Sequence, residues 1–407
     1  MRQSKTHIGI ALVAAVLSAL TAEAYTFKVK VDPRDPPETD MRMSILVLAA
    51  GALTAAAIAG AKDVDVRDFG AKGDGKASDT EAIQRAIDAA AAVQGTVWFP
   101  AGTYRCHDLK ARPHITLLAD PVWIFQGAKA GAVLELDDPD AACLLDVTGA
   151  FGVHVHGLML NGIRKTPKPV HGIFLNNTEK WSPKEDTFVF DDVKVMHFSG
   201  HGIYLNRIWL FIIRHSQCFG NGGDGMCIRG WDGFVTDNQF SANGGNGFGC
   251  LEVGATVMFT ANRVEWNKGY GLYLCGGDDW NVTGNSFDRN WGAGLCCEGT
   301  STLSVTGNVF RRCGKDSNQL AEGEKSCQVR LKGVRGLAMT GNTCLAGRDD
   351  GGKGLYTPQV GFILEKLSYS VITSNSLYRG FMQDMVVDLG GHGEGFILKD
   401  NVGCPMK

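Results

Sequence analysis

A repeated pattern of asparagine and glycine constrains the fold of this chain more than any other feature of its sequence. Four segments read Asn, any residue, Gly, any residue, Gly and then a large apolar residue, and they start at Asn221, Asn243, Asn267 and Asn290. The starts are 22, 24 and 23 residues apart. A second phased position lies five residues before each start and continues along the chain as Ser216, Asn238, Asn262, Asn285, Asn308, Asn342, Asn375 and Asn401. A period of this length predicts a solenoid, in which each repeat stacks its side chains on those of its neighbours.

A mostly apolar residue follows two places after each position of the second series. These residues are Cys218, Phe240, Val264, Phe287, Phe310, Cys344, Leu377 and Gly403. We expect the first five of them, from Cys218 to Phe310, to form an inward stack. We expect the asparagines to form a ladder, in which each side-chain amide bonds to the next coil where the chain turns.

The composition of the 407 residues bounds the class of protein. Hydrophobic residues make up 44% of the chain, which is enough for a large core, and the net charge of −3 gives no overall bias toward nucleic acids or anionic membranes. Glycine is abundant at 53 residues, because each repeat uses two or more glycines in its turn. Because the net charge shows no excess of positive charge, we expect no nucleic-acid partner.

The N-terminus carries the pattern of a secretory signal. Arg2 and Lys5 precede an apolar run over residues 8–20, and the small residues Ala22 and Ala24 end it. This run is short for a membrane span. We predict a secreted or periplasmic protein that has no membrane association after signal removal.

A second signal follows the first. Met41 and Met43 precede another short apolar run over residues 45–58, which also ends in small residues. We interpret Met41 or Met43 as the true start and residues 1–40 as an extension. The alternative is a real first signal followed by a short anchor. In both cases residues 1–61 are targeting sequence and residues 62–407 form the folded domain.

The 12 cysteines all lie from Cys106 onward and lack a Cys-x-x-Cys metal or redox spacing. Four of them recur at intervals of 22–25 residues, namely Cys227, Cys250, Cys275 and Cys297. Adjacent coils lie about 4.8 Å apart, so we expect these thiols to stack within the range that permits a disulfide. The alternative is that they are buried thiols that act as small apolar residues. The sequence alone does not pair them.

A capped helix is expected before the repeats. Ser78 and Glu81 fit a capping box, and apolar residues at helical spacing follow, so we predict a helix over residues 80–92. Two short strands with tight turns come next. A solenoid needs its apolar end covered, and this helix is placed to cover it.

The same region resembles the N-terminal module of the pectate-lyase superfamily. The resemblance rests on DFGAKGDG at 68–75, SDTEAIQRAI at 78–87 and VWFPAGTY at 97–104. This superfamily includes polygalacturonases, rhamnogalacturonases, uronan epimerases, inulin fructotransferases and phage tailspikes. The resemblance implies a single-stranded right-handed parallel β-helix, an all-β fold with a short N-terminal capping helix, and carbohydrate chemistry. In such a coil Ile203 and Leu205 would face inward and Tyr204 outward.

Three polar segments are insertions that make their coils longer than the usual repeat. They span residues 176–187, 311–326 and 346–359. Polar insertions in a solenoid usually form loops on one face, so we expect them to form walls of a binding groove. Plain surface decoration is the alternative.

A row of polar residues is predicted at the start of one sheet. The variable residue in front of the second glycine is, from repeat to repeat, His171, His201, Asp224, Asn246, Tyr270 and Ala293. Register would place neighbours about 5 Å apart. The alternative is a set of turn residues chosen for left-handed backbone, although a purely structural position would repeat one residue type.

This row also resembles a feature of polygalacturonases, whose catalytic aspartates and Gly-His-Gly histidine occupy the same place in successive coils. Gly200-His201-Gly202 resembles the histidine element and Asp224-Gly225 an aspartate element, while Arg330-Leu-Lys332 resembles their Arg-Ile-Lys element. The order is reversed, however, and the row holds only one carboxylate. This departure argues against hydrolysis of the polygalacturonase type.

A second row is predicted at the other end of the same strand. It would contain Arg229, Glu252, Asp278, Asp279 and Glu298. Glu252 and Glu298 would be about 10 Å apart and Asp278 about 5 Å from either, separations that bracket inverting and retaining glycosidases. The alternative is a surface ion pair between Arg229 and Glu252 beside solvated carboxylates.

Aromatic residues near these coils would suit sugar stacking or, alternatively, ordinary packing. They are Tyr273, Trp231, Trp266, Trp280 and Trp291.

The first row suggests β-elimination on a uronate sugar. We expect His201 to be the base, Asp224 to orient it or to bind Ca²⁺, and Tyr270 to donate the proton. Asn246 would bond to the developing charge. Hydrolysis through Glu252 and Asp278 is the competing mechanism. The remaining candidates for substrate binding are His171, Arg229, Trp231, Asp278, Asp279, Trp280 and Glu298.

We therefore predict an exported enzyme that cleaves glycosidic bonds of a polysaccharide or oligosaccharide in a groove along the β-helix, with lyase chemistry favoured. A glycoside hydrolase, an inulin-type fructotransferase and a non-catalytic sugar-binding or adhesion solenoid are the alternatives. No cofactor is required on this reading, with Ca²⁺ left open, and a homotrimer is the expected assembly if one forms.

Overall fold

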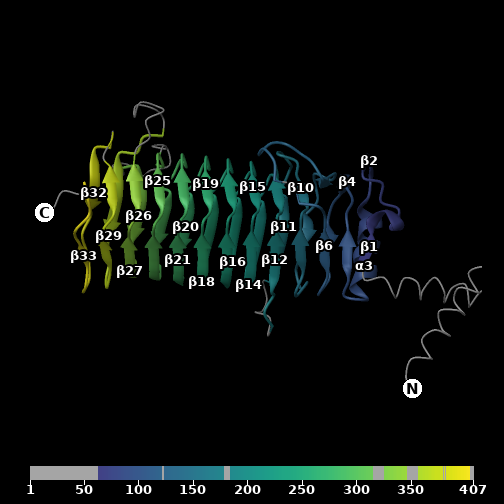
Figure 1. Cartoon of the computed structure of the whole chain (residues 1–407), viewed down its shortest axis with the longest axis horizontal. Coiled ribbons are helices and arrows are strands. Elements are labelled where there is room, and N and C mark those ends of the chain that lie inside the picture. Colours follow the sequence, from purple (N-terminus) through teal and green to yellow (C-terminus); the bar gives the residue numbers. More distant parts are fainter. Residues whose placement is uncertain are drawn as a thin grey trace, which may run out of the picture. The chain divides into compact units, whose positions relative to one another are not determined.

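The computed structural model describes residues 63–121, 123–177, 184–314, 325–345, 356–378, 380 and 382–403. All of them belong to one compact unit, in which short strands stack coil upon coil (Figure 1). Both predicted targeting signals lie outside the described residues, as do most of the three predicted insertions and the last cysteine, Cys404.

The N-terminal end of the unit is covered by helical structure. After β1 (Asp63–Asp65), η1 (Val66–Phe69) and β2 (Asp74–Ser78) comes α3 (Thr80–Ala91), which confirms the predicted helix. Its buried face consists of Ala82, Ile83, Ala86, Ile87 and Ala90. Within the described ranges no helix is long and apolar enough to cross a membrane.

The predicted capping box of this helix is wrong. The N-cap residue is Asp79 rather than Ser78, and no side chain caps the helix. The carboxylate of Asp79 instead accepts hydrogen bonds from the backbone N–H groups of Lys72 and Gly73, at 2.7 and 3.0 Å. Its side chain therefore fixes the preceding loop rather than the helix terminus.

Two parallel sheets form the body of the molecule. The smaller has 12 strands among the described residues. They are β2, β4 (Gly102–Cys106), β7 (Ala132–Leu136), β10 (Met159–Asn161), β13 (Lys194–Met196), β15 (Gln217–Phe219), β17 (Gln239–Ser241), β19 (Arg263–Glu265), β22 (Ser286–Asp288), β25 (Val309–Arg311), β28 (Thr343–Leu345) and β31 (Ser376–Tyr378).

In the part of the chain that the structure describes, the larger sheet has 21 strands. Its N-terminal strands are β1, β3 (Thr96–Trp98), β5 (Leu109–Lys110), β6 (Thr116–Leu118), β8 (Cys143–Asp146), β9 (His154–His156), β11 (His171–Asn176), β12 (Phe188–Asp191), β14 (Ile203–Arg214), β16 (Met226–Thr236) and β18 (Phe248–Thr260). The others are β20 (Leu272–Cys275), β21 (Asp278–Thr283), β23 (Leu295–Glu298), β24 (Ser301–Thr306), β26 (Cys327–Lys332), β27 (Arg335–Thr340), β29 (Val360–Glu365), β30 (Val371–Thr373), β32 (Asp384–Asp388) and β33 (Ile397–Leu398).

The larger sheet turns a corner, so that each coil contributes three strands to the solenoid. In one coil β19 pairs in the smaller sheet, while β20 and β21 pair in the larger sheet on either side of Gly276 and Gly277. Both glycines have positive φ, at 73° and 77°, which residues with a Cβ rarely adopt. The strands β14, β16 and β18 run through the same corner with a register shift. The architecture is the predicted parallel β-helix.

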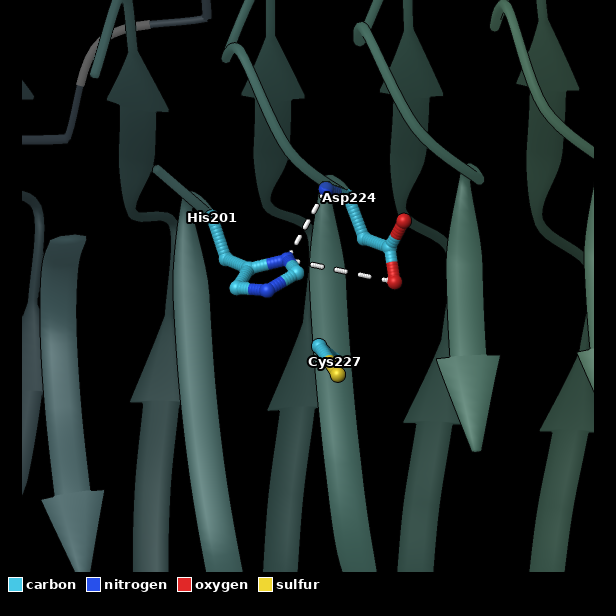
Figure 2. Close-up of side chains that lie close together, drawn as sticks. All are labelled: His201, Asp224 and Cys227. Atoms are coloured by element: carbon cyan, nitrogen blue, oxygen red, sulfur yellow. Dashed lines mark hydrogen bonds and ion pairs between the residues drawn. The ribbon is translucent and has the colours of Figure 1, made fainter. Parts of the chain in front are cut away.

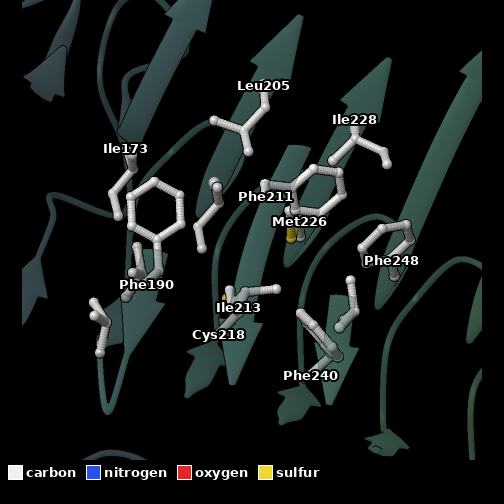
Figure 3. Close-up of a cluster of buried hydrophobic side chains, with 14 of the residues drawn as sticks. Ile173, Phe190, Leu205, Phe211, Ile213, Cys218, Met226, Ile228, Phe240 and Phe248 are labelled. Atoms are coloured by element: carbon white, nitrogen blue, oxygen red, sulfur yellow. The ribbon is translucent and has the colours of Figure 1, made fainter. Parts of the chain in front are cut away.

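The core is a column of apolar side chains inside the coils. In the predicted stack Cys218, Phe240, Val264, Phe287 and Phe310 are all buried. The rings of Phe287 and Phe310 lie nearly parallel with centroids 5.0 Å apart. Inward side chains of neighbouring strands, including Leu205 and Ile228, pack against one another in Figure 3. The predicted stack is therefore confirmed.

The asparagine ladders hold adjacent coils at the turns. Asn262 Oδ1 accepts hydrogen bonds from the backbone N–H and the Nδ2 of Asn238, at 3.0 and 3.1 Å. Asn262 Nδ2 donates to the carbonyl oxygen of Val235 and to Oδ1 of Asn285. Asn243 and Asn267 repeat this pattern in the second ladder. These buried amides satisfy turn groups that no strand pairs.

The predicted stack of four cysteines is wrong. Cys250 is in register with Ile228 and Leu274 and faces the core, whereas Cys227 is in register with Tyr204. The intervals between the cysteines, 23, 25 and 22 residues, each differ by one from the coil lengths of 22, 24 and 23 residues, which turns successive thiols to opposite faces of the strand. The eleven cysteines of the described part are free thiols.

Candidate active site

The predicted first row forms, and hydrogen bonds join it from coil to coil. His201 accepts from the backbone N–H of Asp224 through Nδ1, at 2.9 Å. Asp224 Oδ1 accepts from the N–H of Asn246 at 2.6 Å, and Asn246 Oδ1 accepts from the N–H of Tyr270 at 2.8 Å. At the start of the row His171 Nδ1 accepts from the N–H of His201, and the two rings stack at 5.3 Å. Each of these side chains thus accepts a hydrogen bond from the backbone of the turn in the next coil.

The hydrogen bond to Nδ1 determines the tautomer of neutral His201. Because Nδ1 accepts the Asp224 N–H, the ring proton lies on Nε2, which points away from that turn (Figure 2). Burial lowers the pKa of His201 although the carboxylate of Asp224 opposes this shift. The neutral ring therefore presents an N–H donor to the outer surface of the sheet.

Asp224 is the buried carboxylate of the row. Its side chain is 9% exposed, and Oδ2 lies 3.9 Å from Nδ1 of His201. Burial raises the pKa of Asp224, while His201 and the N–H of Asn246 lower it. A carboxylate that is desolvated in this way is a stronger base than one in water.

A glycine allows this carboxylate to lie close to the backbone of the next coil. Gly249 on β18 is in register with Cys227 on β16 and with Tyr273 on β20. A Cβ atom at Gly249 would lie 2.6 Å from Oδ2 of Asp224. The missing side chain leaves a break in the row of side chains between Cys227 and Tyr273, which we call the Gly249 gap, and the carboxylate of Asp224 and the amide of Asn246 lie against it.

A small groove adjoins the row. It has a volume of about 170 Å³ and is lined by Tyr204, Leu205, Asn206, Cys227, Ile228, Arg229, Leu251 and Glu252. Arg229 forms an ion pair with Glu252. Burial raises the pKa of Tyr204, so its phenol stays protonated. A guanidinium and a phenol therefore face the same groove beside Asp224.

Two tyrosines and a glutamate lie beyond the Gly249 gap. The rings of Tyr270 and Tyr273 stack at 5.2 Å, and the hydroxyl of Tyr273 donates to Oε2 of Glu298 at 3.1 Å. Burial is the main cause that raises the pKa of both phenols. Tyr273 is thus a proton donor with a carboxylate partner.

Three potential ligand atoms meet in the row, but they do not suit Ca²⁺. The imidazole, carboxylate and thiol of His201, Asp224 and Cys227 lie within 4.8 Å of one another. Figure 2 shows His201 just before β14, with Asp224 just before the adjacent strand β16 and Cys227 on β16. Ca²⁺ prefers a shell of oxygen ligands. Burial also raises the pKa of Cys227 and keeps it a thiol rather than a thiolate ligand.

The predicted second row does not form. Glu298 is in register with Cys275 and Lys332, whereas Asp278 is in register with Ala255 and Ser301 beyond the corner. Asp279 follows Asp278 with positive φ, and both are exposed. The glycine corner and the register shift in β18 separate Asp278 and Asp279 from Glu252 and Glu298. The ion pair between Arg229 and Glu252 is the part of this prediction that the structure contains.

One predicted sugar-stacking residue is instead part of the core. Trp280 is 2% exposed, and its indole N–H donates to the carbonyl oxygen of Gly254. The alternation of β21 begins after the corner and turns this side chain inward. Trp231 is partly exposed and in register with Trp209, also beyond the corner from the first row.

The sequence reasoning missed Gly249 and the role of Tyr204. Both lie three residues after a member of the first row, as Cys227 and Tyr273 do. That spacing is visible in the sequence. The significance of Gly249 is not, because the chain contains 53 glycines.

Comparison with known proteins agrees with the fold. Residues 171–332 match the family described as right handed beta helix region. Residues 64–133 match the family described as rhamnogalacturonase A/epimerase, pectate lyase-like. The chain is therefore a right-handed parallel β-helix protein of the pectate-lyase-like superfamily, as the resemblance implied.

The similar proteins include curated relatives from Azotobacter vinelandii. Mannuronan C5-epimerase AlgE2 is 32% identical over 236 residues, which is 52% of this chain and 22% of the epimerase. Alginate lyase 7 is 31% identical over 197 residues, which is 45% of this chain and 22% of the lyase. This chain thus spans 22% of the length of each of these two relatives.

A solved structure from the same organism shares the fold. The A-module of mannuronan C-5 epimerase AlgE6 superposes with a TM-score of 0.59 at 20% identity, covering 85% of this chain and 100% of the module.

Proposed function

We propose that this protein is an enzyme that acts on a polysaccharide of uronate sugars by removing the ring proton next to the carboxyl group. The observation that carries the proposal is the Gly249 gap, which lies beside the buried carboxylate of Asp224 with Tyr273 in register on its far side. Relatives named as mannuronan epimerases and as an alginate lyase support this reaction class. Both reactions begin by removal of that proton.

The base in this proposal is Asp224. Oδ2 borders the gap, and its raised pKa strengthens it as a base. His201 was the base predicted from the sequence. Because its Nδ1 is an acceptor, we assign it instead a donor role, in which Nε2–H bonds to the substrate.

The charge that develops on the substrate needs a cationic partner. Arg229 lines the adjoining groove and forms an ion pair with Glu252. Its guanidinium can bind the substrate carboxylate in a bidentate manner, either together with Glu252 or in place of it. A neutralised carboxylate makes the neighbouring proton more acidic. Arg229 is therefore the proposed partner of the substrate carboxylate.

The proton donor is Tyr273, on the other side of the gap from Asp224. Tyr273 is in register with Gly249 in the adjacent coil, about 5 Å away, so a sugar ring bound over the outer face of the gap can contact both Oδ2 of Asp224 and the Tyr273 hydroxyl. If Tyr273 protonates the leaving oxygen, the product is an unsaturated uronate. If it returns a proton to the ring carbon, the sugar is epimerised. We favour elimination, with epimerisation as the second outcome of the same first step.

The test uses mannuronan in D₂O with the wild-type protein, Asp224→Asn and Gly249→Ala. Elimination gives ultraviolet absorbance from the new double bond, and epimerisation gives deuterium at the ring carbon next to the carboxyl group. Asp224→Asn should lower kcat by about 10²-fold or more. Gly249→Ala should also lower kcat, because its Cβ would lie 2.6 Å from Oδ2 of Asp224 and would displace the carboxylate.

Asp278→Asn is the matched control, since Asp278 is an exposed carboxylate outside the row. It should leave activity unchanged. Activity of the wild type should rise with pH through the pKa of Asp224, which lies above the ordinary carboxyl value. New reducing ends without a double bond or deuterium, or full activity in Asp224→Asn, would refute the proposal.

We also propose that the protein is exported, on the strength of the two N-terminal signal patterns.

A further inference from the structure

A second and larger groove lies on the smaller sheet, away from the first row. Its volume is about 690 Å³, which is within the range of small-ligand sites. We call it the β15–β19 groove. It is lined by Trp123, Ile124, Phe125, Gln126, Gln217, Asp237, Asn238, Gln239, Ala261, Arg263 and Glu265.

The wall of this groove is a loop that buried polar groups hold in place. Lys194 on β13 is 2% exposed, and its Nζ donates to the carbonyl oxygens of Phe125 and Ala128, at 2.9 and 3.1 Å. Gln126 Nε2 donates to Ser241 Oγ at 3.1 Å and to Glu265 Oε1 at 3.3 Å. The loop is thus bonded to three strands of the sheet, which makes the groove a preformed feature.

The floor of the groove is a chain of side-chain hydrogen bonds with one vacant acceptor. Gln217 Nε2 donates to Gln239 Oε1, and Gln239 Nε2 donates to Glu265 Oε1, both at 2.9 Å. These bonds fix the orientation of both amides. Gln217 is 3% exposed, yet its Oε1 has no hydrogen-bond partner among the described residues. A buried acceptor without a donor costs about 1–3 kcal/mol, so it favours a ligand that brings an O–H or N–H group.

Two aromatic side chains on the loop are exposed at the edge of this floor. Trp123 is 59% exposed and Phe125 is 82% exposed. Exposed aromatic rings that border a polar floor mark interaction sites. The groove therefore combines flat apolar surfaces with hydrogen-bond acceptors.

The charges in the groove select against an acidic ligand. The cation among the lining residues, Arg263, donates through Nε to Glu265 Oε2 at 2.9 Å. Asp237 is exposed and adds a negative charge. A polyanion would meet more negative than positive charge there.

We propose that the β15–β19 groove binds a neutral oligosaccharide. A sugar ring has an apolar C–H face that can lie on Trp123 or Phe125, and hydroxyl groups that can donate to Gln217 Oε1 and Asp237. This inference does not depend on the proposed reaction at Asp224. It gives the protein a second carbohydrate site, on a different sheet and of opposite charge preference to a site for uronates.

The experiment measures binding of cellohexaose, mannohexaose and hexamannuronate by calorimetry and by quenching of tryptophan fluorescence. At least one neutral hexasaccharide should bind, and it should bind at least tenfold more tightly to wild type than to the Trp123→Ala/Phe125→Ala double variant. Gln217→Met keeps the shape of the side chain but removes the acceptor. It should also weaken binding, by a smaller factor than the double variant does. Tyr378→Ala is the matched control, because Tyr378 is an exposed aromatic on β31 of the same sheet, outside the groove.

Asp224→Asn separates this proposal from the proposed function. It should lose turnover of mannuronan and keep the full affinity for the neutral hexasaccharide. Absence of binding by both neutral hexasaccharides at millimolar concentration would overturn the inference. So would binding that survives in the double variant, or hexamannuronate that binds in the groove as tightly as the neutral probes.

Discussion

At the scale of single residues, this protein keeps several ionisable groups away from water. Asp186 is 1% exposed, and one oxygen of its carboxylate accepts the backbone N–H of Trp209 at 2.8 Å. Burial raises its pKa from 3.8 to about 6. A carboxyl group whose pKa is higher in the folded than in the unfolded state binds its proton more tightly when folded. Folding stability should therefore fall as the pH rises from about 4 to 6.

Asp186→Asn should remove this part of the pH dependence. We expect the variant to have a free energy of unfolding about 1–3 kcal/mol above that of wild type at pH 8, since a charged buried carboxylate no longer forms. Near pH 4 the carboxyl group is protonated in the folded protein, so the free energies of unfolding of variant and wild type should differ little. Chemical denaturation across this pH range is the measurement, with the exposed Asp278→Asn as control. An equal difference between variant and wild type at both ends of the range would contradict the argument.

The residues of the first row could be predicted from the sequence because the asparagines fix the register. Once Asn221 and Asn243 are aligned, His201, Asp224 and Asn246 must become lateral neighbours. The sequence does not show which nitrogen of His201 accepts a hydrogen bond. That depends on a turn in the next coil, and it changed the role that we assign to the ring.

At the scale of elements, the asparagine ladder satisfies the hydrogen-bonding groups of the turns, as side-chain caps do at the ends of helices in other folds. Asn262 takes part in hydrogen bonds to Asn238, Val235 and Asn285, all of them buried. Asn262→Ala should lower the free energy of unfolding by about 2–4 kcal/mol, because it leaves turn groups unpaired on both adjacent coils. Urea denaturation measures this change.

The control for the ladder is Asn281→Ala. Asn281 is partly exposed on β21 and lies outside the ladder, so its replacement should cost less than about 1 kcal/mol. Equal costs for the two substitutions would show that ladder position carries no special stability.

The errors of prediction at this scale come from the corner of the larger sheet. The prediction placed Glu252, Asp278 and Glu298 in one row because it treated each coil as having a single unbroken strand at this position. Gly276 and Gly277 divide that strand, and the alternation of inward and outward side chains restarts after them. The same restart buries Trp280. A two-residue corner has no periodic signal of its own, whereas a ladder repeated over many coils has a strong one.

At the scale of the whole molecule, a solenoid of parallel strands leaves apolar surface at its ends. The helix α3 covers the N-terminal end with Ile83 and Ile87, which are both fully buried. Ile87→Asp should detach this helix, because a buried unpaired charge costs several kcal/mol. Since each coil contacts only its neighbours, the loss should be local at first.

Hydrogen exchange followed by mass spectrometry tests this expectation. Amides of α3, β1 and β3 should exchange faster in Ile87→Asp than in wild type, while those of β19 to β24 keep their protection. Glu81→Ala, an exposed change on the same helix, is the control. Uniform loss of protection along the chain would show that the solenoid unfolds as one unit.

The helix, the parallel β-helix and its core stack could be predicted from the sequence, since each repeats a local pattern. The β15–β19 groove could not. It depends on a loop near Trp123 that packs on strands more than 90 residues later in the chain, and no spacing in the sequence records that contact.

The ladders have a consequence for how such a protein can change its length. In the coils that carry both ladders, each asparagine forms the same hydrogen bonds with the next coil as the asparagine before it, so a segment such as 262–284 contains all the groups that bond to the coil on either side. Duplicating that segment would add one layer and keep all ladders unbroken on either side. The length of the solenoid is then a whole number of layers, and genetic duplication in units of about two dozen residues can change it while the hydrogen bonds between layers stay the same.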